Sequence, residues 1–295
     1  MKRRIITLCA GIPVVAGLSL SSCSSDTAVP ETMPIEISSP KVTLLDDGDG
    51  ETAKVRWHDD GAEQTNSVII TQGFVQKGAD EQSDSTFPDT RLEMPLTTKA
   101  TAGESRAVTA TVGKPFGSNA ELNEDIGTAE GFVMEWTAKD TGLIEEMKVG
   151  APDKASETAR AGIEAALHQL NDVPVVFPDE AIGKGASWTV ENEVSSSTAM
   201  QQKITYTLKE REGDVLTLNV AVEQAPAVTE LDAGEGAKLT VVDAKTETRE
   251  GRLVIDVTKP LPVEGTIDYV TEVIYGDGAS DTRIVQQAHR ALQFQ

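Results

Sequence analysis

The sequence is poor in aromatic residues, in cysteine and in positive charge. Phe, Trp and Tyr make up 4% of its 295 residues, and 26 lysines and arginines stand against 48 aspartates and glutamates, a formal net charge of −22. Nucleic-acid binding depends on clustered basic residues that neutralise phosphates and on aromatic rings that stack on bases, so this composition argues against a nucleic-acid partner. Two cysteines are too few for a disulfide scaffold or a zinc ribbon.

The first residues carry the pattern of a secretory signal. Lys2, Arg3 and Arg4 precede an apolar run from Ile5 to Leu20, which is shorter than the roughly 20 residues that a helix needs to cross a bilayer. A charged start, an apolar middle and small residues at the exit are typical of a signal peptide. We therefore expect residues 1–22 to be removed, and with them Cys9.

The exit of this segment, Leu20-Ser21-Ser22-Cys23, resembles the lipobox of bacterial lipoproteins. The resemblance implies that the Cys23 sulfur receives a diacylglycerol and that cleavage makes Cys23 the N-terminus, with fatty acids such as palmitate as the acyl groups. Two or three chains hold a protein durably, because each buried methylene contributes ~0.8 kcal/mol. We expect attachment to the cell membrane at its extracytoplasmic face, with Cys23 as the lipidation site. The alternative is an ordinary signal peptide followed by a cysteine without lipid.

Residues 23–40 are rich in serine, proline, threonine and glutamate and show no periodicity. Such a segment buries too little apolar surface to offset the entropy of ordering it. The prediction is a lipidated N-terminus with a flexible tether over residues 23–40.

The rest of the chain consists of short runs rich in valine, isoleucine and threonine, separated by Gly, Asp and Pro. Alternation of apolar and polar residues predicts strands, and short turns between them favour an antiparallel sheet. Residues 76–92 and 113–129 lack a period and are expected to be long loops. The C-terminal run from Ile284 to Phe294 fits a strand or a helix, and we favour the strand. Two β-rich halves are expected, at residues 41–150 and 173–295.

One segment breaks this texture. Within residues 151–172, apolar residues recur at the spacing of a helix and would form a narrow stripe along one side of it. They are Ala155, Ala159, Ile163, Ala166, Leu167 and Leu170. Asp153 is the expected N-cap, and Val173-Pro174 ends the helix. The predicted fold class is mainly β with one central helix (α+β), in which antiparallel sheet wraps around or packs on the helix, as one domain or as two similar halves.

The stretch Phe177-Pro178-Asp179-Glu180-Ala181-Ile182-Gly183-Lys184-Gly185-Ala186-Ser187-Trp188 carries a second resemblance. With Val42 to Gly48, Tyr206 to Leu208, Gly213 to Leu218 and Thr258 to Pro262, it is similar to a family of uncharacterised secreted proteins and lipoproteins of Gram-positive-type bacteria. The resemblance implies an envelope location and a β-rich fold, and it supplies no activity or ligand. From the residues alone, Pro178, Gly183 and Gly185 turn the chain before Trp188 enters the core.

No catalytic or cofactor constellation is evident. The histidines, His58, His168 and His289, lack metal-site spacing such as HExxH, and no G-x-S-x-G elbow occurs. Lys184 lies between two glycines without the spacing of a phosphate-binding loop. Asp46, Asp47, Asp49 and Glu51 offer oxygens in a glycine-containing turn, but they do not match an EF-hand, so a solvated turn is favoured over a calcium site. We expect no enzyme activity, no metal and no cofactor.

These features favour a non-catalytic lipoprotein of the cell envelope that binds a lipid-like or protein ligand in an apolar concavity. Lipid-carrier lipoproteins of bacterial envelopes share a curved sheet with a helix, which is an analogy of fold only. Two alternatives stay open. One is a hydrolase of envelope polymer that uses two carboxylates across a cleft, and the other is a structural or assembly lipoprotein. The expected partners are the membrane, through Cys23, and a lipid or envelope protein.

Overall fold

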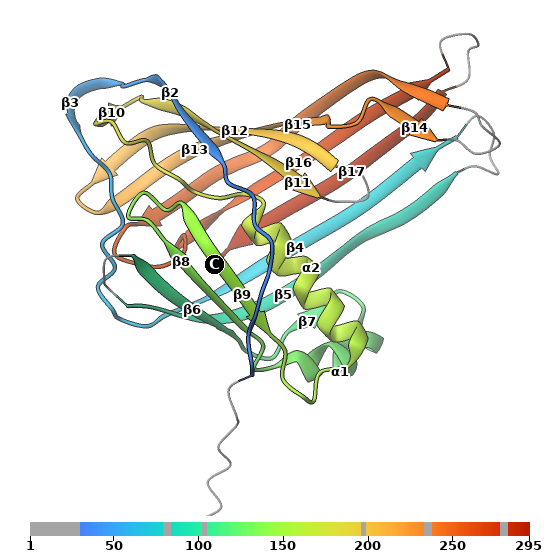
Figure 1. Cartoon of the computed structure of the whole chain (residues 1–295), viewed down its shortest axis with the longest axis horizontal. Helices are drawn as coiled ribbons and strands as arrows, with labels where there is room; N and C mark the ends of the chain where they lie inside the picture. The colour runs from blue at the N-terminus through green and yellow to red at the C-terminus, as the bar shows by residue number, and fades with distance from the viewer. Residues whose placement is uncertain (1–29, 79–83, 102–104, 196–198, 233–237, 278–282) are drawn as a thin grey trace, which may run out of the picture.

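The fold is dominated by one large antiparallel sheet (Figure 1). The computed structural model describes residues 30–78, 84–101, 105–195, 199–232, 238–277 and 283–295. The strands are β1 (Met33–Pro34), β2 (Lys41–Asp46), β3 (Asp49–Ala53), β4 (Gln64–Lys77), β5 (Ser85–Thr101), β6 (Arg106–Val112), β7 (Phe116–Gly117), β8 (Val133–Ala138), β9 (Ile144–Gly150), β10 (Ile182–Lys184), β11 (Ser187–Ser195), β12 (Ala199–Glu212), β13 (Val215–Pro226), β14 (Glu230–Asp232), β15 (Lys238–Asp256), β16 (Glu264–Gly276) and β17 (Arg283–Phe294).

Along the sheet the strand order is β1-β9-β8-β6-β5-β4-β17-β16-β15-β13-β12-β11-β2. The strands that follow α2 (Glu157–Asn171) therefore continue the sheet of those that precede it, through the pairing of β17 with β4. The early strand β2 closes the far edge by pairing with β11. In the described residues, the two predicted β-rich halves thus share one sheet, apart from the small β3–β10 pair.

The predicted helix begins later than expected. Ser156, not Asp153, is its N-cap, because the Ser156 Oγ accepts the hydrogen bond of Ala159 N at 3.0 Å. Pro152 to Ala155 form a turn instead, closed by the bond from Ala155 N to Pro152 O. The helix is followed by Asp172 as C-cap and by Val173-Pro174, as predicted.

Further short helices lie in residues 113–129, the stretch expected to be a loop. They are α1 (Asn123–Ile126) and two 3₁₀ turns, Ala120–Leu122 and Gly127–Ala129. The prediction of a loop at residues 76–92 is wrong for most of this range, because β4 extends to Lys77 and β5 begins at Ser85. Residues 238–256 form one long strand, β15, whose pairing with β16 is interrupted by two bulges. The strand favoured at the C-terminus is confirmed as β17.

The described part of the predicted tether, residues 30–40, contacts the body of the protein. Met33 and Pro34 pair with β9, and Ile35 N donates to Met147 O at 3.0 Å. Ile35 and Ile37 pack against the core. Burial of these apolar side chains and pairing with the free edge of β9 order this segment, although its proline- and serine-rich composition predicts a flexible tether. Residues 1–29, which include the predicted signal peptide and Cys23, lie outside the described part of the chain.

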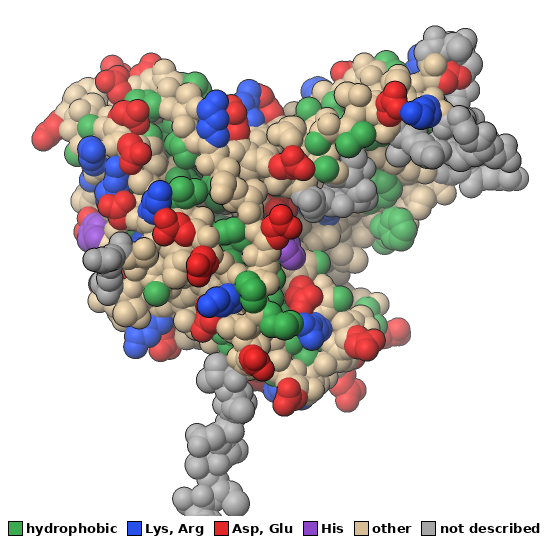
Figure 2. Space-filling view, viewed as in Figure 1, with side chains coloured by type: hydrophobic (Ala, Val, Ile, Leu, Met, Phe, Trp, Pro, Cys, Tyr) green, Lys and Arg blue, Asp and Glu red, His purple; other side chains and the backbone are tan. Residues whose placement is uncertain are grey.

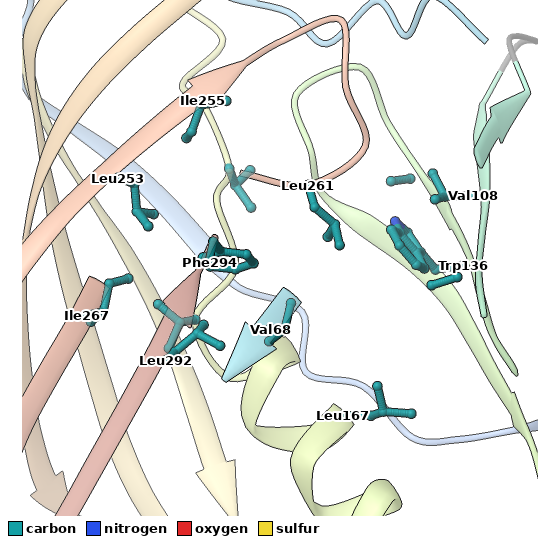
Figure 3. Packing of buried hydrophobic residues seen from close by; sticks show 14 of the residues in the cluster. Val68, Val108, Trp136, Leu167, Leu253, Ile255, Leu261, Ile267, Leu292 and Phe294 are labelled. Atoms are coloured by element: carbon teal, nitrogen blue, oxygen red, sulfur yellow. The ribbon is translucent and has the colours of Figure 1, made fainter. Parts of the chain in front are cut away.

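A single large core cluster joins the sheet, the helix and the segment that follows the helix. The α2 side chains of Ala159, Ile163, Ala166 and Leu167 are buried in it. Figure 3 shows Leu167 of α2 below Val68 of β4, with Leu292 and Phe294 of β17 on one side and Trp136 of β8 on the other. The small side chains of the helical stripe allow the helix backbone to approach the strands closely.

Trp188 is the centre of an aromatic row in this core. It is 0% exposed, as expected from its place after a turn, and it stacks on Tyr206 with ring centroids 5.6 Å apart. Phe177 lies 5.9 Å from Trp188, and Trp57 lies 5.8 Å from Phe177. Trp188 Nε1 donates to Val176 O at 2.9 Å. The contacts along this row hold the segment after α2 against the inner face of β11 and β12.

Candidate functional site

A hollow that we call the main hollow lies between α2 and the face of the sheet that α2 covers. It is smaller than the shallow space of about 690 Å³ beside β3, β10 and β12. Its volume is about 390 Å³, within the range of small-molecule sites. Figure 2 shows the surface cut back between the part of the molecule that holds α2 and the projecting ends of the long strands. The helix contributes Ala165, His168, Gln169 and Asp172 to its wall.

The sheet supplies an apolar floor to the main hollow. Phe74 comes from β4, Met200 from β12, Val273 from β16 and Ala288 from β17. Val273 and Met200 also belong to a second core cluster, separate from the large one. This cluster lines the outer end of the strands, beyond the end of α2.

A row of polar side chains crosses the same face of the sheet, which we call the polar belt. It runs over seven adjacent strands, β11, β12, β13, β15, β16, β17 and β4. Its members face one another through the strand register and through hydrogen bonds, and they are Asn192, Gln202, Gln224, Thr246, Thr271, Tyr269, Arg290 and Gln72.

Hydrogen bonds connect the belt from strand to strand. Gln202 Nε2 donates to Asn192 Oδ1 at 3.2 Å, and Gln224 Nε2 donates to Gln202 Oε1 at 2.8 Å. Thr271 Oγ1 donates to Gln224 Oε1 at 2.8 Å, and it lies 3.2 Å from Thr246 Oγ1. Buried amides and hydroxyls need such partners, and the amides and hydroxyls of the belt find them in one another.

The belt also holds the C-terminal end of α2. The carbonyl oxygen of Asp172 accepts hydrogen bonds from Gln202 Nε2 at 2.6 Å and from Asn192 Nδ2 at 3.2 Å. Helix C-termini leave carbonyls without partners, which these two side chains supply. The helix end is therefore fixed above the belt.

Asp172 brings an acidic side chain to the wall of the main hollow. Burial raises its pKa to about 7, against the smaller opposite effect of the Arg290 guanidinium. No other aspartate or glutamate contributes to the wall among the described residues. Among the described residues, the wall of this hollow therefore has one carboxylate, whereas the hydrolase alternative requires two that face each other across a cleft.

The interior holds two smaller spaces. One, of about 290 Å³, lies between α2, α1, β4 and β5, and it shares Gln72 and Ala165 with the main hollow. The other, of about 90 Å³, lies in the core shown in Figure 3, lined among others by Trp57, Trp136 and Phe294. Trp57 Nε1 is buried there without a hydrogen-bond partner.

The three histidines lie apart. His168 is exposed at the rim of the main hollow. His58 lies 3.3 Å from Asp214. His289 points to the other face of β17, where Asp89 and Asp268 lie 2.8 and 3.1 Å from its two ring nitrogens.

The acidic turn after β2 is solvent-exposed, as favoured from its sequence. Asp46, Asp47, Asp49 and Glu51 are all exposed, and Asp46 Oδ1 accepts a hydrogen bond from Gly48 N at 2.8 Å. In the described ranges no three His, Cys, Asp or Glu side chains gather as a metal site would require. Within the same ranges, no helix has the length and apolar character of a membrane span.

The sequence interpretation overlooked the belt and Asp172, although a signal for the belt was present. Inward positions in several strands have the order apolar, polar, apolar, as in Val190, Asn192 and Val194 of β11, and Ile70, Gln72 and Phe74 of β4. A single polar residue in such a series is easily overlooked. Its recurrence on neighbouring strands becomes evident only when the register is known.

One family model matches the chain. It is described as a family of unknown function (DUF6263), and the match covers residues 156–257, from the start of α2 to the end of β15. The matched segment includes Asp172 and four belt residues, Asn192, Gln202, Gln224 and Thr246. No curated protein and no solved structure matches the chain.

Proposed function

We propose that this protein is a lipid-anchored binding protein of the cell envelope that takes an amphiphilic small molecule into the main hollow. In this proposal the sheet wraps around α2 as its central helix and leaves the hollow at the outer end of the strands. The observation that carries the proposal is the hollow itself, of about 390 Å³ with an apolar floor and a polar belt. An apolar space with a few polar groups is the usual form of a site for a small amphiphile.

The location is the second part of the proposal. The signal-like residues 1–22 and the lipobox-like Leu20 to Cys23 support an extracytoplasmic protein attached to the membrane through Cys23. The net charge of −22 supports a body held away from anionic head groups, which repel it within about a Debye length.

Blocking the hollow should abolish binding. Ala288 lies on its floor, so Ala288→Trp fills the space, whereas Gln287→Trp places the same ring on the opposite, exposed face of β17. With a fluorescent long-chain fatty acid as probe, we expect Ala288→Trp to reduce affinity at least tenfold and Gln287→Trp to leave it within about twofold, since each tenfold is about 1.4 kcal/mol. Equal affinities for the two variants would refute the site.

Removal of the thiol should release the protein from the membrane. We expect Cys23→Ala to shift the chain from the detergent phase to the aqueous phase in a Triton X-114 partition, because the acyl chains supply the membrane affinity. Residues 30–295 should keep their stability, because position 23 precedes the folded body. Cys9→Ala is the matched control and should partition as the parent does. Unchanged partition of Cys23→Ala would contradict the anchor.

A further inference from the structure

Arg290 is the one lysine or arginine among the described residues that line the main hollow. Its Nη1 donates to Gln72 Oε1 at 3.2 Å, and no described carboxylate oxygen lies within 4.0 Å of its guanidinium nitrogens. The buried Arg106, by contrast, is paired with Asp59. Arg290 therefore retains donors for a ligand in a protein of strongly negative net charge.

A second polar atom at the same place lacks a partner. Gln169 is 6% exposed, and its Nε2 donates to Thr71 O and Ala291 O, whereas its Oε1 is buried without a hydrogen bond. Gln169 lines the hollow from α2, as Arg290 does from β17. A buried acceptor without a donor costs free energy. An acidic head recovers it only where the head keeps a proton, as the P–OH of a singly charged phosphate monoester does.

Inward of the belt, buried side chains separate the main hollow from the space of about 90 Å³ in the core. The next side chains on the same face are Ile204 on β12, Ile267 on β16 and Leu292 on β17, which are 0%, 1% and 2% exposed. The space outward of the belt is the floor that ends the main hollow, where the apolar Phe74, Val273 and Met200 lie beside Gln286 and Tyr275. A polar group that enters the hollow therefore stops at the belt, and an attached chain extends outward.

We infer that the main hollow binds a single-chain amphiphile with an anionic head, which Arg290 binds at the polar belt, while the chain lies outward over Phe74, Val273 and Met200. This inference rests on the proposed function and gives its ligand class and orientation. The shared chemistry is an acidic head, which a carboxylate or a phosphate provides. A guanidinium forms paired, charge-assisted hydrogen bonds with either group.

The charged and titratable groups that face the head are few. They are Asp172 and His168 from α2, Tyr269 from β16 and Arg290 from β17, with Tyr275 further out. Ionised Asp172 repels an anion, so the head binds better when Asp172 is neutral. Asp172→Asn should therefore strengthen acid binding at pH 8, and His168→Gln, at the exposed rim, should change it little.

The test is calorimetric titration of the full chain with three ligands of one chain length: palmitate, hexadecyl phosphate and the neutral monopalmitoylglycerol. Arg290→Met should weaken both acids by about ten- to a hundredfold, the loss of a charge-assisted hydrogen bond, and should change the neutral ester by less than about threefold. Arg290→Lys should recover part of the acid affinity. The ratio of the two acids shows whether carboxylate or phosphate is preferred.

Two controls separate charge, chain and fold. Arg252→Met removes the same charge from the exposed Arg252–Glu264 pair and should leave every affinity unchanged. Phe74→Ala removes apolar floor and should weaken acids and ester alike, by roughly fivefold. Equal binding of ester and acid by the parent, or an equal loss of both in Arg290→Met, would overturn the inference and leave the proposed function standing. Absence of binding by all three ligands in the parent would overturn both.

Discussion

Replacing Asp172 with asparagine should stabilise the protein at pH 8 by up to about 4 kcal/mol, and by about half as much at pH 5.5. Burial raises the pKa of Asp172 from 3.8 to about 7 in the folded protein. Asparagine has nearly the same shape and never ionises. It therefore removes the cost of burying a charge.

The sign of the pH dependence follows from the raised pKa. Between pH 3.8 and about 7 the folded protein keeps a proton on Asp172 that the unfolded chain has lost. The stability associated with Asp172 is therefore fully present below pH 3.8, falls as the pH rises, and levels off above about 7. Midway between these two pH values, the free energy of unfolding changes by about 1.4 kcal/mol per pH unit.

Chemical denaturation of parent and variant at pH 5.5, 6.5 and 8 measures this difference. Subtraction of the two curves cancels every contribution that the two proteins share. Asp243→Asn, which makes the same substitution at an exposed position of β15, is the matched control. A variant with the same pH profile as the parent would show that Asp172 is solvated.

Trp188→Ala should destabilise the protein by about 3–5 kcal/mol, the usual cost of removing a large buried aromatic side chain. Trp188 is 0% exposed, contacts Phe177 and Tyr206, and donates its indole N–H to Val176 O at 2.9 Å. Alanine leaves a cavity and an unpaired carbonyl in the segment that follows α2.

Urea denaturation at a fixed pH checks this prediction. Trp188→Phe should be intermediate, because it keeps a ring in the row but loses the hydrogen bond to Val176. Phe116→Ala, which truncates a side chain that is 44% exposed, should cost far less. A loss below about 1 kcal/mol in Trp188→Ala would mean that this aromatic row does not hold the segment against the sheet.

Much of the fold follows from local patterns. Alternation and short turns indicate strand pairs such as the hairpin of β12 and β13 around Gly213 and the pair β8–β9, because each pair depends on residues close in the chain. The helical stripe predicted α2, and its N-cap was misplaced because Asp153 and Ser156 are both good capping residues. The turn at Pro152 to Ala155 makes Ser156 the N-cap, and the spacing of the apolar residues gives no information about that turn.

The site could not be derived in the same way. The polar belt joins residues as distant as Gln72 and Arg290, which meet only because β17 pairs with β4. No local spacing indicates that pairing. The raised pKa of Asp172 likewise depends on burial beside the sheet, whereas its sequence context, after the end of a helix, suggests an ordinary solvated acid.

Native mass spectrometry of the full chain, isolated under mild conditions from a bacterial envelope, tests the central proposal most directly. We expect the parent to carry an extra mass that is released on activation and identified as an acidic single-chain amphiphile. Ala288→Trp should lack this mass, and Gln287→Trp should keep it. A parent that carries no small molecule, or that retains the same mass in Ala288→Trp, would contradict binding in the main hollow, and co-isolation of a protein instead would favour an assembly role.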